Sequence, residues 1–217
     1  MKLIFLCSGN GGNLKFIKTY FEFLNLGDVI YVLSDRECGA NKYATDNQIP
    51  NKLISFKNEV ECENILIEIM GKYNPDFIIT NIHKIISPKI VSVFSGKLIN
   101  LHYSILPAFK GFIGMKSLQK ALELKSQFVG STCHYVNEEI DSGKIISQSY
   151  FKVGDNIKIE QKMFQAGALT LLNGLLKLSN NKSISNFKYN EIEFNPSYDL
   201  NRQLISEIFN KLENDEF

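Results

Sequence analysis

The sequence lacks an excess of charge of either sign, and it lacks a long apolar run. With 24 basic and 23 acidic residues among 217, the net charge is +1, so nothing favours a nucleic acid or a membrane surface as partner. No stretch approaches the roughly 20 apolar residues of a membrane span, and the run from Leu3 to Cys7 is too short for the core of a signal peptide. We therefore expect a cytoplasmic protein with a small-molecule partner.

Cysteine and histidine are also sparse. The four cysteines are scattered without a Cys-x-x-Cys pair, and only three histidines are present, namely His83, His102 and His134. A zinc site needs three or four such ligands close together. We predict reduced, mostly buried cysteines and no bound metal.

No repeat, low-complexity tract or Ser/Gly linker divides the chain. Apolar segments typical of strands alternate with amphipathic segments typical of helices, which predicts an α/β fold with a mostly parallel twisted sheet and helices on both faces. We expect one catalytic domain over residues 1–217, with a C-terminal helical extension from about residue 195 to 217. Among the individual elements, we predict a strand over Lys52 to Phe56 and a helix over Ile157 to Leu178. An extended segment over Ser183 to Glu193 and a helix over Asp199 to Leu212 are predicted to follow.

The last of these helices has one apolar face, formed by Leu200, Leu204, Ile208 and Leu212. Such a face either covers the sheet of its own chain or forms a contact in a homodimer. Both interpretations stay open at this point.

The first strand-like run ends in a glycine-rich loop, Ser8-Gly-Asn-Gly-Gly-Asn13, and an amphipathic helix follows. Such a junction directs backbone N–H groups and the positive end of the helix dipole at one point, which makes it an anion site. No Gly-Lys-Ser/Thr follows, so nucleotide triphosphate hydrolysis is disfavoured. The loop half matches a dinucleotide fingerprint, with Asp35 after the second strand, but Leu14 stands where the third glycine belongs. A plain tight turn explains the glycines equally well.

A second polar cluster lies at the end of the strand-like run Leu98 to Leu101. Asn100 and His102 alternate with apolar residues there, so we expect them on the same side of the strand. An amide donor and an imidazole that titrates near neutrality suit a reaction in which an oxyanion develops and a proton moves. Asp141, in a polar turn between two apolar segments, is placed to orient His102 or stabilise its charged form. A purely structural histidine is the alternative.

These residues belong to linked motifs: Asn-Leu-His-x-Ser-x-Leu-Pro with Phe-Lys-Gly, then Gly-Ser-Thr-x-His-x-Val, then Asp-Ser-Gly-Lys-Ile-Ile-Ser-Gln. In this order they resemble the catalytic signature of the folate-dependent formyltransferases, most strongly that of the phosphoribosylglycinamide formyltransferases, from Lys2 to about Tyr150. The resemblance implies a Rossmann-like formyltransferase fold and 10-formyltetrahydrofolate as co-substrate. It makes Asn100, His102 and Asp141 the catalytic set, which transfers a formyl group to a primary amine.

The resemblance also implies two sets of binding residues. Gly11, Gly12 and Asn13 match the loop that holds the acceptor's phosphate, although the family usually has Ser where Gly12 stands. The folate pocket matches His83, Lys84, Ile85, Ile86 and Val91 before the catalytic strand and Asn137, Glu138, Glu139 and Ile140 after it. From the residues alone, Ile85, Ile86 and Val91 are ordinary core. His134 is interpreted as a structural residue or a pocket wall, because it lacks the partners that mark a proton carrier.

The acceptor stays open between two amines. The phosphate loop favours glycinamide ribonucleotide, an intermediate of purine biosynthesis. Against it, the family's acidic residue near Phe164 is missing, with Gln161 and Gln165 nearby, and Tyr103 stands where the family usually has Pro. An amino sugar carried on a nucleotide is the alternative acceptor. From other classes, a dinucleotide-dependent oxidoreductase using Asp35 and an inactive binding protein are kept as alternatives.

Overall fold

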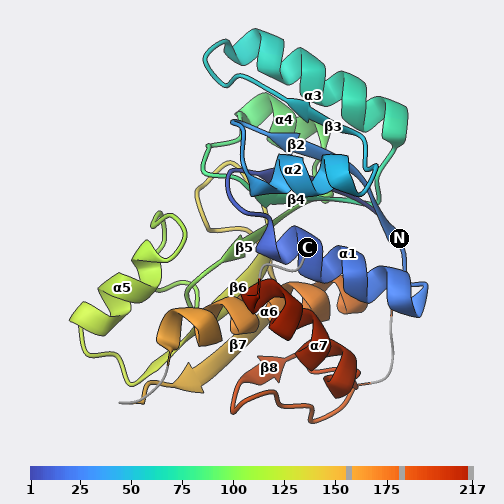
Figure 1. Cartoon of the computed structure of the whole chain (residues 1–217). Helices are drawn as coiled ribbons and strands as arrows, with labels where there is room; N and C mark the ends of the chain where they lie inside the picture. Colours follow the sequence, from blue (N-terminus) through green and yellow to red (C-terminus); the bar gives the residue numbers. More distant parts are fainter. Residues whose placement is uncertain (155–157, 181–183, 215–217) are drawn as a thin grey trace. The chain divides into compact units, whose positions relative to one another are not determined.

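The structure is a computed structural model that describes residues 1–154, 158–180 and 184–214. Its strands form one sheet in the order β3-β2-β1-β4-β5-β6-β7-β8 (Figure 1). The parallel part contains β1 (Lys2–Cys7), β2 (Asp28–Ser34), β3 (Asn51–Leu53), β4 (Phe77–Asn81) and β5 (Leu98–His102). Antiparallel pairing joins β6 (Phe128–Tyr135), β7 (Ile145–Lys152) and β8 (Glu193–Asn195). The predicted α/β fold with a mostly parallel sheet is confirmed.

The chain divides into two compact units, which are described separately. The N-terminal unit contains Met1–Asn100, Val136–Glu138 and the end of the chain from Asn210. The C-terminal unit contains Leu101–Tyr135 and Glu139–Phe209. The boundary falls within β5, between Asn100 and Leu101.

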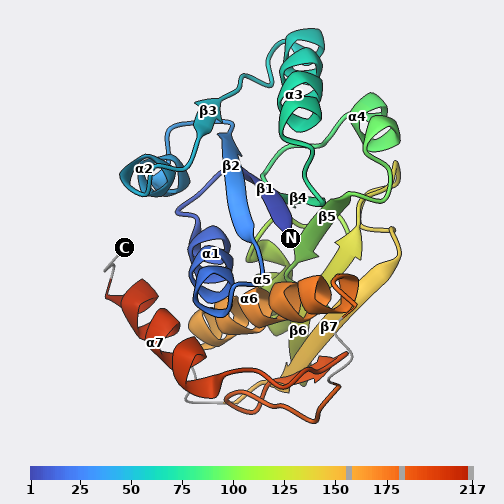
Figure 2. The same ribbon diagram turned by 90° about the vertical axis from the view of Figure 1, so that its right-hand side faces the viewer.

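The N-terminal unit carries four helices on its parallel strands, namely α1 (Gly12–Leu24), α2 (Gly39–Asp46), α3 (Glu59–Tyr73) and α4 (Pro88–Val93). Figure 2 shows α1 and α3 on opposite sides of β1 and β2. On the α3 side, alternate strand residues such as Ile4, Leu33 and Ile78 pack with Leu66 and Ile90 in one core, as the period of two along a strand requires. Helix α4 begins at Pro88, because the Ser87 side chain accepts a hydrogen bond from the Ile90 backbone N–H.

The C-terminal unit contains α5 (Lys116–Glu123), α6 (Ile159–Leu178) and most of α7 (Arg202–Glu213). Helix α6 packs on β6 and β7 through buried hydroxyls: Ser131 Oγ lies 2.8 Å from Thr170 Oγ1, and Ser147 Oγ donates to the Thr170 carbonyl at 2.7 Å. A Cβ at Gly174 would lie 2.8 Å from Cys133 Sγ. This glycine therefore permits the close approach of α6 to the sheet.

Two predicted extended segments differ from the structure. Strand β3 covers Asn51–Leu53 rather than Lys52 to Phe56, because only these residues pair with β2. The segment predicted as extended over Ser183 to Glu193 forms only isolated bridges in its described part, and the strand that pairs with β7 is Glu193–Asn195. Its first residue, Ser183, and the predicted helix start, Ile157, lie outside the described residues.

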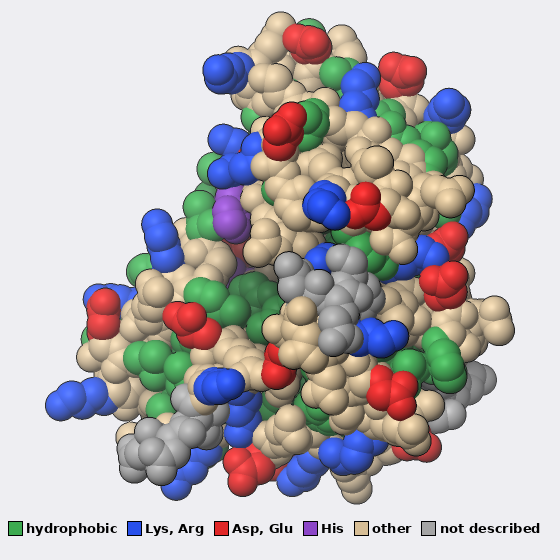
Figure 3. Space-filling view, in the orientation of Figure 1, with side chains coloured by type: hydrophobic (Ala, Val, Ile, Leu, Met, Phe, Trp, Pro, Cys, Tyr) green, Lys and Arg blue, Asp and Glu red, His purple; other side chains and the backbone are tan. Residues whose placement is uncertain are grey.

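The apolar side of α7 is buried in its own chain. Leu204, Ile205, Ile208 and Phe209 are buried, and the Phe209 ring lies 5.7 Å from the Tyr189 ring. This packing agrees with a covering role for the helix. On the face shown in Figure 3, acidic and basic side chains are interspersed. No helix within the described ranges is long and apolar enough to cross a membrane.

Candidate active site

Asp141 lies at the centre of a cluster of polar groups in the C-terminal unit. Its Oδ2 accepts a hydrogen bond from the Gly111 backbone N–H at 2.8 Å and lies 3.4 Å from His102 Nδ1. Its Oδ1 lies 3.6 Å from His134 Nε2. Asp141 has φ +51°, a left-handed conformation that costs free energy in most residues but that Asp and Asn tolerate. Its turn therefore places a largely buried carboxylate between two imidazoles.

His102 is held at both ring nitrogens. Its side chain is only 5% exposed, and its Nε2 lies 2.9 Å from the Phe109 carbonyl oxygen. Burial lowers the pKa of His102 below its ordinary value, and the opposing effects of Asp141 and the Phe109 carbonyl offset only part of this. Burial alone would raise the pKa of Asp141, but hydrogen bonds from His134 and Gly111, together with the charge of His102, lower it. At neutral pH the carboxylate is ionised and His102 is predominantly neutral.

The structure corrects the interpretation of His134. This residue, 2% exposed, has the acidic partner that was thought to be missing, because its Nε2 faces Asp141 while its Nδ1 lies 2.8 Å from the Tyr135 carbonyl oxygen. The pairing of β6 with β7 shifts register between Cys133 and His134. Such a bulge turns a side chain in a direction that strand alternation does not predict. The sequence pattern therefore did not predict that His134 faces the Asp141 carboxylate.

The segment after His102 is fixed by two residues that the sequence analysis did not single out. Thr132 Oγ1 donates to the Ser104 carbonyl at 2.7 Å and accepts from the Leu106 backbone N–H at 3.0 Å. Gln148 Nε2 reaches the Leu106 carbonyl at 3.1 Å. Both lie in the motifs quoted above, but their roles depend on contacts between segments far apart in the chain. They hold the loop whose Phe109 carbonyl meets His102.

Asn100, the third predicted catalytic residue, belongs to the N-terminal unit. The Thr80 hydroxyl of β4 lies 3.3 Å from Asn100 Oδ1 and 3.2 Å from the Ile99 carbonyl oxygen. Thr80 is buried, so it gives the amide a fixed orientation. With Oδ1 directed at Thr80, the NH₂ group is the end of Asn100 that can donate to a substrate.

The predicted phosphate loop lies at the start of α1. Gly11 has φ +75°, and a Cβ there would lie 3.1 Å from Ala40, so the loop depends on glycine at this position. Asn13 is 3% exposed, and its Nδ2 donates to Asn81 Oδ1 at 3.0 Å. The N–H groups of the first turn of α1, which include that of Gly12, have the geometry of an anion site.

Asp35, which supported the oxidoreductase alternative, lies at the end of β2 with a side chain that is 1% exposed. Arg36 engages both carboxylate oxygens, Nε to Oδ1 at 3.0 Å and Nη2 to Oδ2 at 2.7 Å. Burial raises the pKa of Asp35, but hydrogen bonds with Arg36 and Ser8 outweigh it and lower the pKa. A ribose would have to displace this arginine, so the geometry does not favour a dinucleotide.

The predicted folate residues are divided between the two units. In the N-terminal unit, Val91 belongs to a buried core against which both Ile86 and Val136, the residue before Asn137, pack. Ile85 is 76% exposed, which corrects its interpretation as core. The remaining residues of the N-terminal unit, His83, Lys84, Asn137 and Glu138, are exposed, and so are Glu139 and Ile140 in the C-terminal unit.

His83 is also tied to the phosphate loop, because its backbone N–H donates to Ser8 Oγ at 2.8 Å. Within the described residues, no group of three or more His, Cys, Asp or Glu side chains is placed to hold a metal ion. The C-terminal unit therefore presents acid–base groups, and the N-terminal unit presents a side-chain amide and the predicted anion loop.

Comparisons with known proteins give a consistent relationship. A family described as formyl transferase matches residues 1–167. The chain is 32% identical over 161 residues to the chloroplastic phosphoribosylglycinamide formyltransferase of Arabidopsis thaliana, covering 70% of this chain and 55% of that protein. It is 35% identical over 122 residues to the formyltetrahydrofolate deformylase of Haemophilus influenzae, covering 55% of this chain and 42% of that protein. The chain thus spans about half the length of these relatives.

The fold is similar to that of solved structures. The phosphoribosylglycinamide formyltransferase of Anaplasma phagocytophilum superposes with a TM-score of 0.75 at 23% identity, over 89% of this chain and 93% of that one. At this identity the likeness concerns the fold, and it agrees with the parallel sheet described above.

Proposed function

Because this chain belongs to the formyl transferase family, we propose that it transfers a formyl group from 10-formyltetrahydrofolate to a primary amine. The observation that carries the proposal is the placement of Asp141 between His102 and His134, at 3.4 and 3.6 Å. A buried carboxylate with two imidazoles is suited to move one proton and to stabilise the charge that appears while it moves.

The reaction needs a base at its start. The free amine attacks the formyl carbon, which gives a tetrahedral centre with an oxyanion and a positively charged nitrogen. His102 is buried with a lowered pKa, so it is neutral and able to take up the amine's proton. The resulting imidazolium is stabilised by Asp141, and the proton passes to the folate nitrogen as the carbon–nitrogen bond breaks.

The oxyanion needs donors as it forms. The Phe109 carbonyl oxygen lies 2.9 Å from His102 Nε2. A formyl oxygen could take this position once the loop moves aside, and Nε2 donates to it after His102 has taken up the amine's proton. Asn100, oriented by Thr80, supplies a second donor through its NH₂ group. In this account the Phe109 carbonyl oxygen occupies the position that the oxyanion takes during the reaction.

The binding places of the folate donor and of the amine acceptor are assigned from the kind of surface that each molecule needs. The exposed Ile85, beside the partly buried Ile86, offers an apolar surface of the kind that a pterin ring needs. The loop at Gly11 to Asn13 takes a terminal phosphate, which favours glycinamide ribonucleotide and a role in purine biosynthesis. The name of the Arabidopsis relative supports this acceptor. A nucleotide-linked amino sugar is kept as the second acceptor, because Gln165 stands where a carboxylate for the ribose is expected.

A second reaction deserves a test, because the Haemophilus relative is named a formyltetrahydrofolate deformylase. The catalytic set Asn100, His102 and Asp141 would then act on a water molecule in place of the amine, and formate would be released. An acceptor screen with purified protein and 10-formyltetrahydrofolate separates the two reactions. Formyl transfer predicts a formylated amine whose yield matches donor consumption, whereas hydrolysis predicts formate at an equal rate with and without amine.

A further inference from the structure

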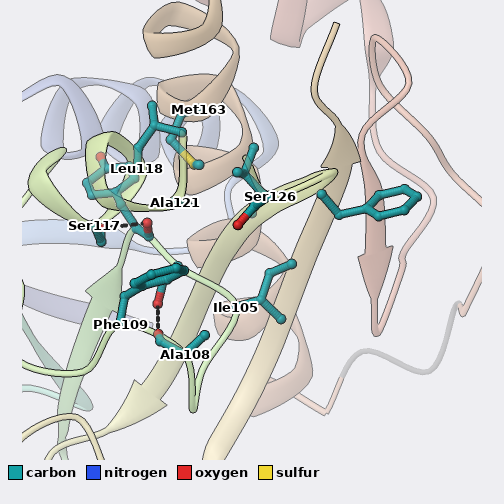
Figure 4. A pocket seen from close by; sticks show the side chains of 13 residues that line it. Ile105, Ala108, Phe109, Ser117, Leu118, Ala121, Ser126 and Met163 are labelled. Atoms are coloured by element: carbon teal, nitrogen blue, oxygen red, sulfur yellow. Dashed lines mark hydrogen bonds between the residues drawn. The ribbon is translucent and has the colours of Figure 1, made fainter. Parts of the chain in front are cut away.

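A cavity of about 260 Å³ lies in the C-terminal unit, and the residues that follow His102 in the chain help to line it (Figure 4). Part of its wall is formed by Tyr103, Ser104 and Ile105, which follow His102 in the chain. Phe109 forms another part, and the carbonyl oxygen of the same residue meets His102 Nε2 at 2.9 Å. The cavity is therefore connected to the catalytic imidazole through Tyr103, its neighbour in the chain, and through Phe109, whose carbonyl meets it.

The lining of the cavity is apolar. Figure 4 shows Met163 of α6 and Leu118 of α5 on one side and Ile105 and Ala108 on the other. Among the described residues that line it, none carries a charge. Two of the lining serines already donate within the protein, Ser104 to the Ala108 carbonyl and Ser117 to the Tyr103 carbonyl at 2.7 Å. A phosphate or a carboxylate would find no charged partner here, whereas an alkyl or ring surface would.

The shape depends on Tyr103 and Gly167. A Cβ at Gly167 would lie 2.5 Å from Tyr103 Cε1, so the ring rests against the backbone of α6 because residue 167 lacks a side chain. Tyr103 is thereby held as a wall of the cavity. Apolar cavities of about 150 Å³ accommodate a benzene ring, so this one has room for a six-membered ring or a short alkyl chain.

We propose that this cavity receives an uncharged, largely apolar group that the acceptor carries next to its amine. The proposal rests on formyl transfer as the reaction, and it widens the range of acceptors beyond phosphoribosyl amines. A group that fills the cavity also pushes against the Phe109 ring, whose carbonyl must leave His102 before the formyl oxygen can bind. Binding of a group in the cavity and activation of His102 are thus linked through Phe109.

The test uses linear primary amines from ethylamine to hexylamine, which have nearly the same basicity and differ in apolar length alone. With the wild-type protein and 10-formyltetrahydrofolate, mass spectrometry of the N-alkylformamides gives kcat/KM for each. We expect kcat/KM to rise by about fourfold for each methylene that enters the cavity, and then to level off when the cavity is full.

Variants identify the cavity as the cause. Ala108 is exposed at the rim, so Ala108→Leu obstructs the cavity without disturbing the core and should flatten the series. Ser126→Leu, on another wall, should do the same. Gln127→Leu, exposed and outside the lining, is the matched control and should keep the wild-type slope.

A flat series in the wild type, or an unchanged slope in both cavity variants, would overturn the proposal. So would a protein that formylates glycinamide ribonucleotide but gives no alkylformamide. If neither type of amine is formylated, the proposed reaction itself has failed, and the two failures are therefore distinguishable.

Discussion

Replacing Asp141 by Asn removes one charge and little else. Asn tolerates the left-handed conformation at φ +51° and can still accept the hydrogen bond from the Gly111 N–H. What is lost is the carboxylate charge 3.4 Å from His102 and 3.6 Å from His134. We therefore expect a folded protein whose defect is in catalysis.

The size of the defect follows from the charge that His102 gains during the reaction. Two unit charges 3.4 Å apart interact by about 5 kcal/mol at an effective dielectric constant of about 20. Part of this interaction is replaced by the amide dipole and by water, so a loss of roughly 3 to 5 kcal/mol in transition-state stabilisation is expected. This corresponds to a decrease in kcat on the order of 10² to 10⁴.

The assay measures kcat and its pH dependence in the wild type and the variant. Asp141 raises the pKa of His102 against the larger lowering effect of burial, so its loss should lower that pKa further. The acid limb of the pH–rate profile should move to lower pH. Glu123→Gln, which removes an exposed carboxylate 3.0 Å from Lys120, is the matched control and should change kcat less than about fivefold. A variant with wild-type kcat, or an acid limb that moves to higher pH, would refute the reasoning.

His102→Ala should lower kcat by on the order of 10² to 10⁴. The double variant with Asp141→Asn should lose much less activity than the product of the single effects, because the pair acts as a unit. A strictly multiplicative loss of kcat would show that the two residues act independently. Gly143→Ala should lower both the melting temperature and kcat, since a Cβ there would collide with the Tyr135 carbonyl beneath the Asp141 turn, and a variant unchanged in both would contradict this packing. Gly12→Ser restores the hydroxyl usual in the family and should lower KM for glycinamide ribonucleotide about tenfold, through one hydrogen bond to a charged group. An unchanged KM would show that the acceptor's phosphate does not bind at this loop.

Much of the fold could be predicted from sequence periodicity. The alternation of apolar strands with amphipathic helices holds from β1 to α4, because these contacts repeat locally. Periodicity failed after α6, where the described part of the segment up to Asn190 makes single bridges instead of a strand. Alternating residues in an irregular segment imitate a strand, and only pairing with β7 shows which residues belong to one.

The candidate site was predictable where motif and chemistry coincide. His102 and Asp141 were identified as a pair, and the structure places them together. The acidic partner of His134 was not predicted, because the register shift beside Cys133 is invisible in the residue pattern. The sequence also does not show that Thr132 supports the loop after His102, because its hydrogen bonds to Leu106 and Ser104 span 26 and 28 positions of the chain. Long-range hydrogen bonds leave no periodic signal.

The central claim is that His102 and Asp141 move a formyl group from folate to an amine. Its most direct test follows a ¹³C-labelled formyl group from 10-formyltetrahydrofolate in a single turnover with glycinamide ribonucleotide. We predict that the label appears in the formamide at the rate at which the donor disappears, and that both rates fall together in the Asp141→Asn variant. Label found only in formate, or a formamide rate unaffected by the substitution, would contradict the account.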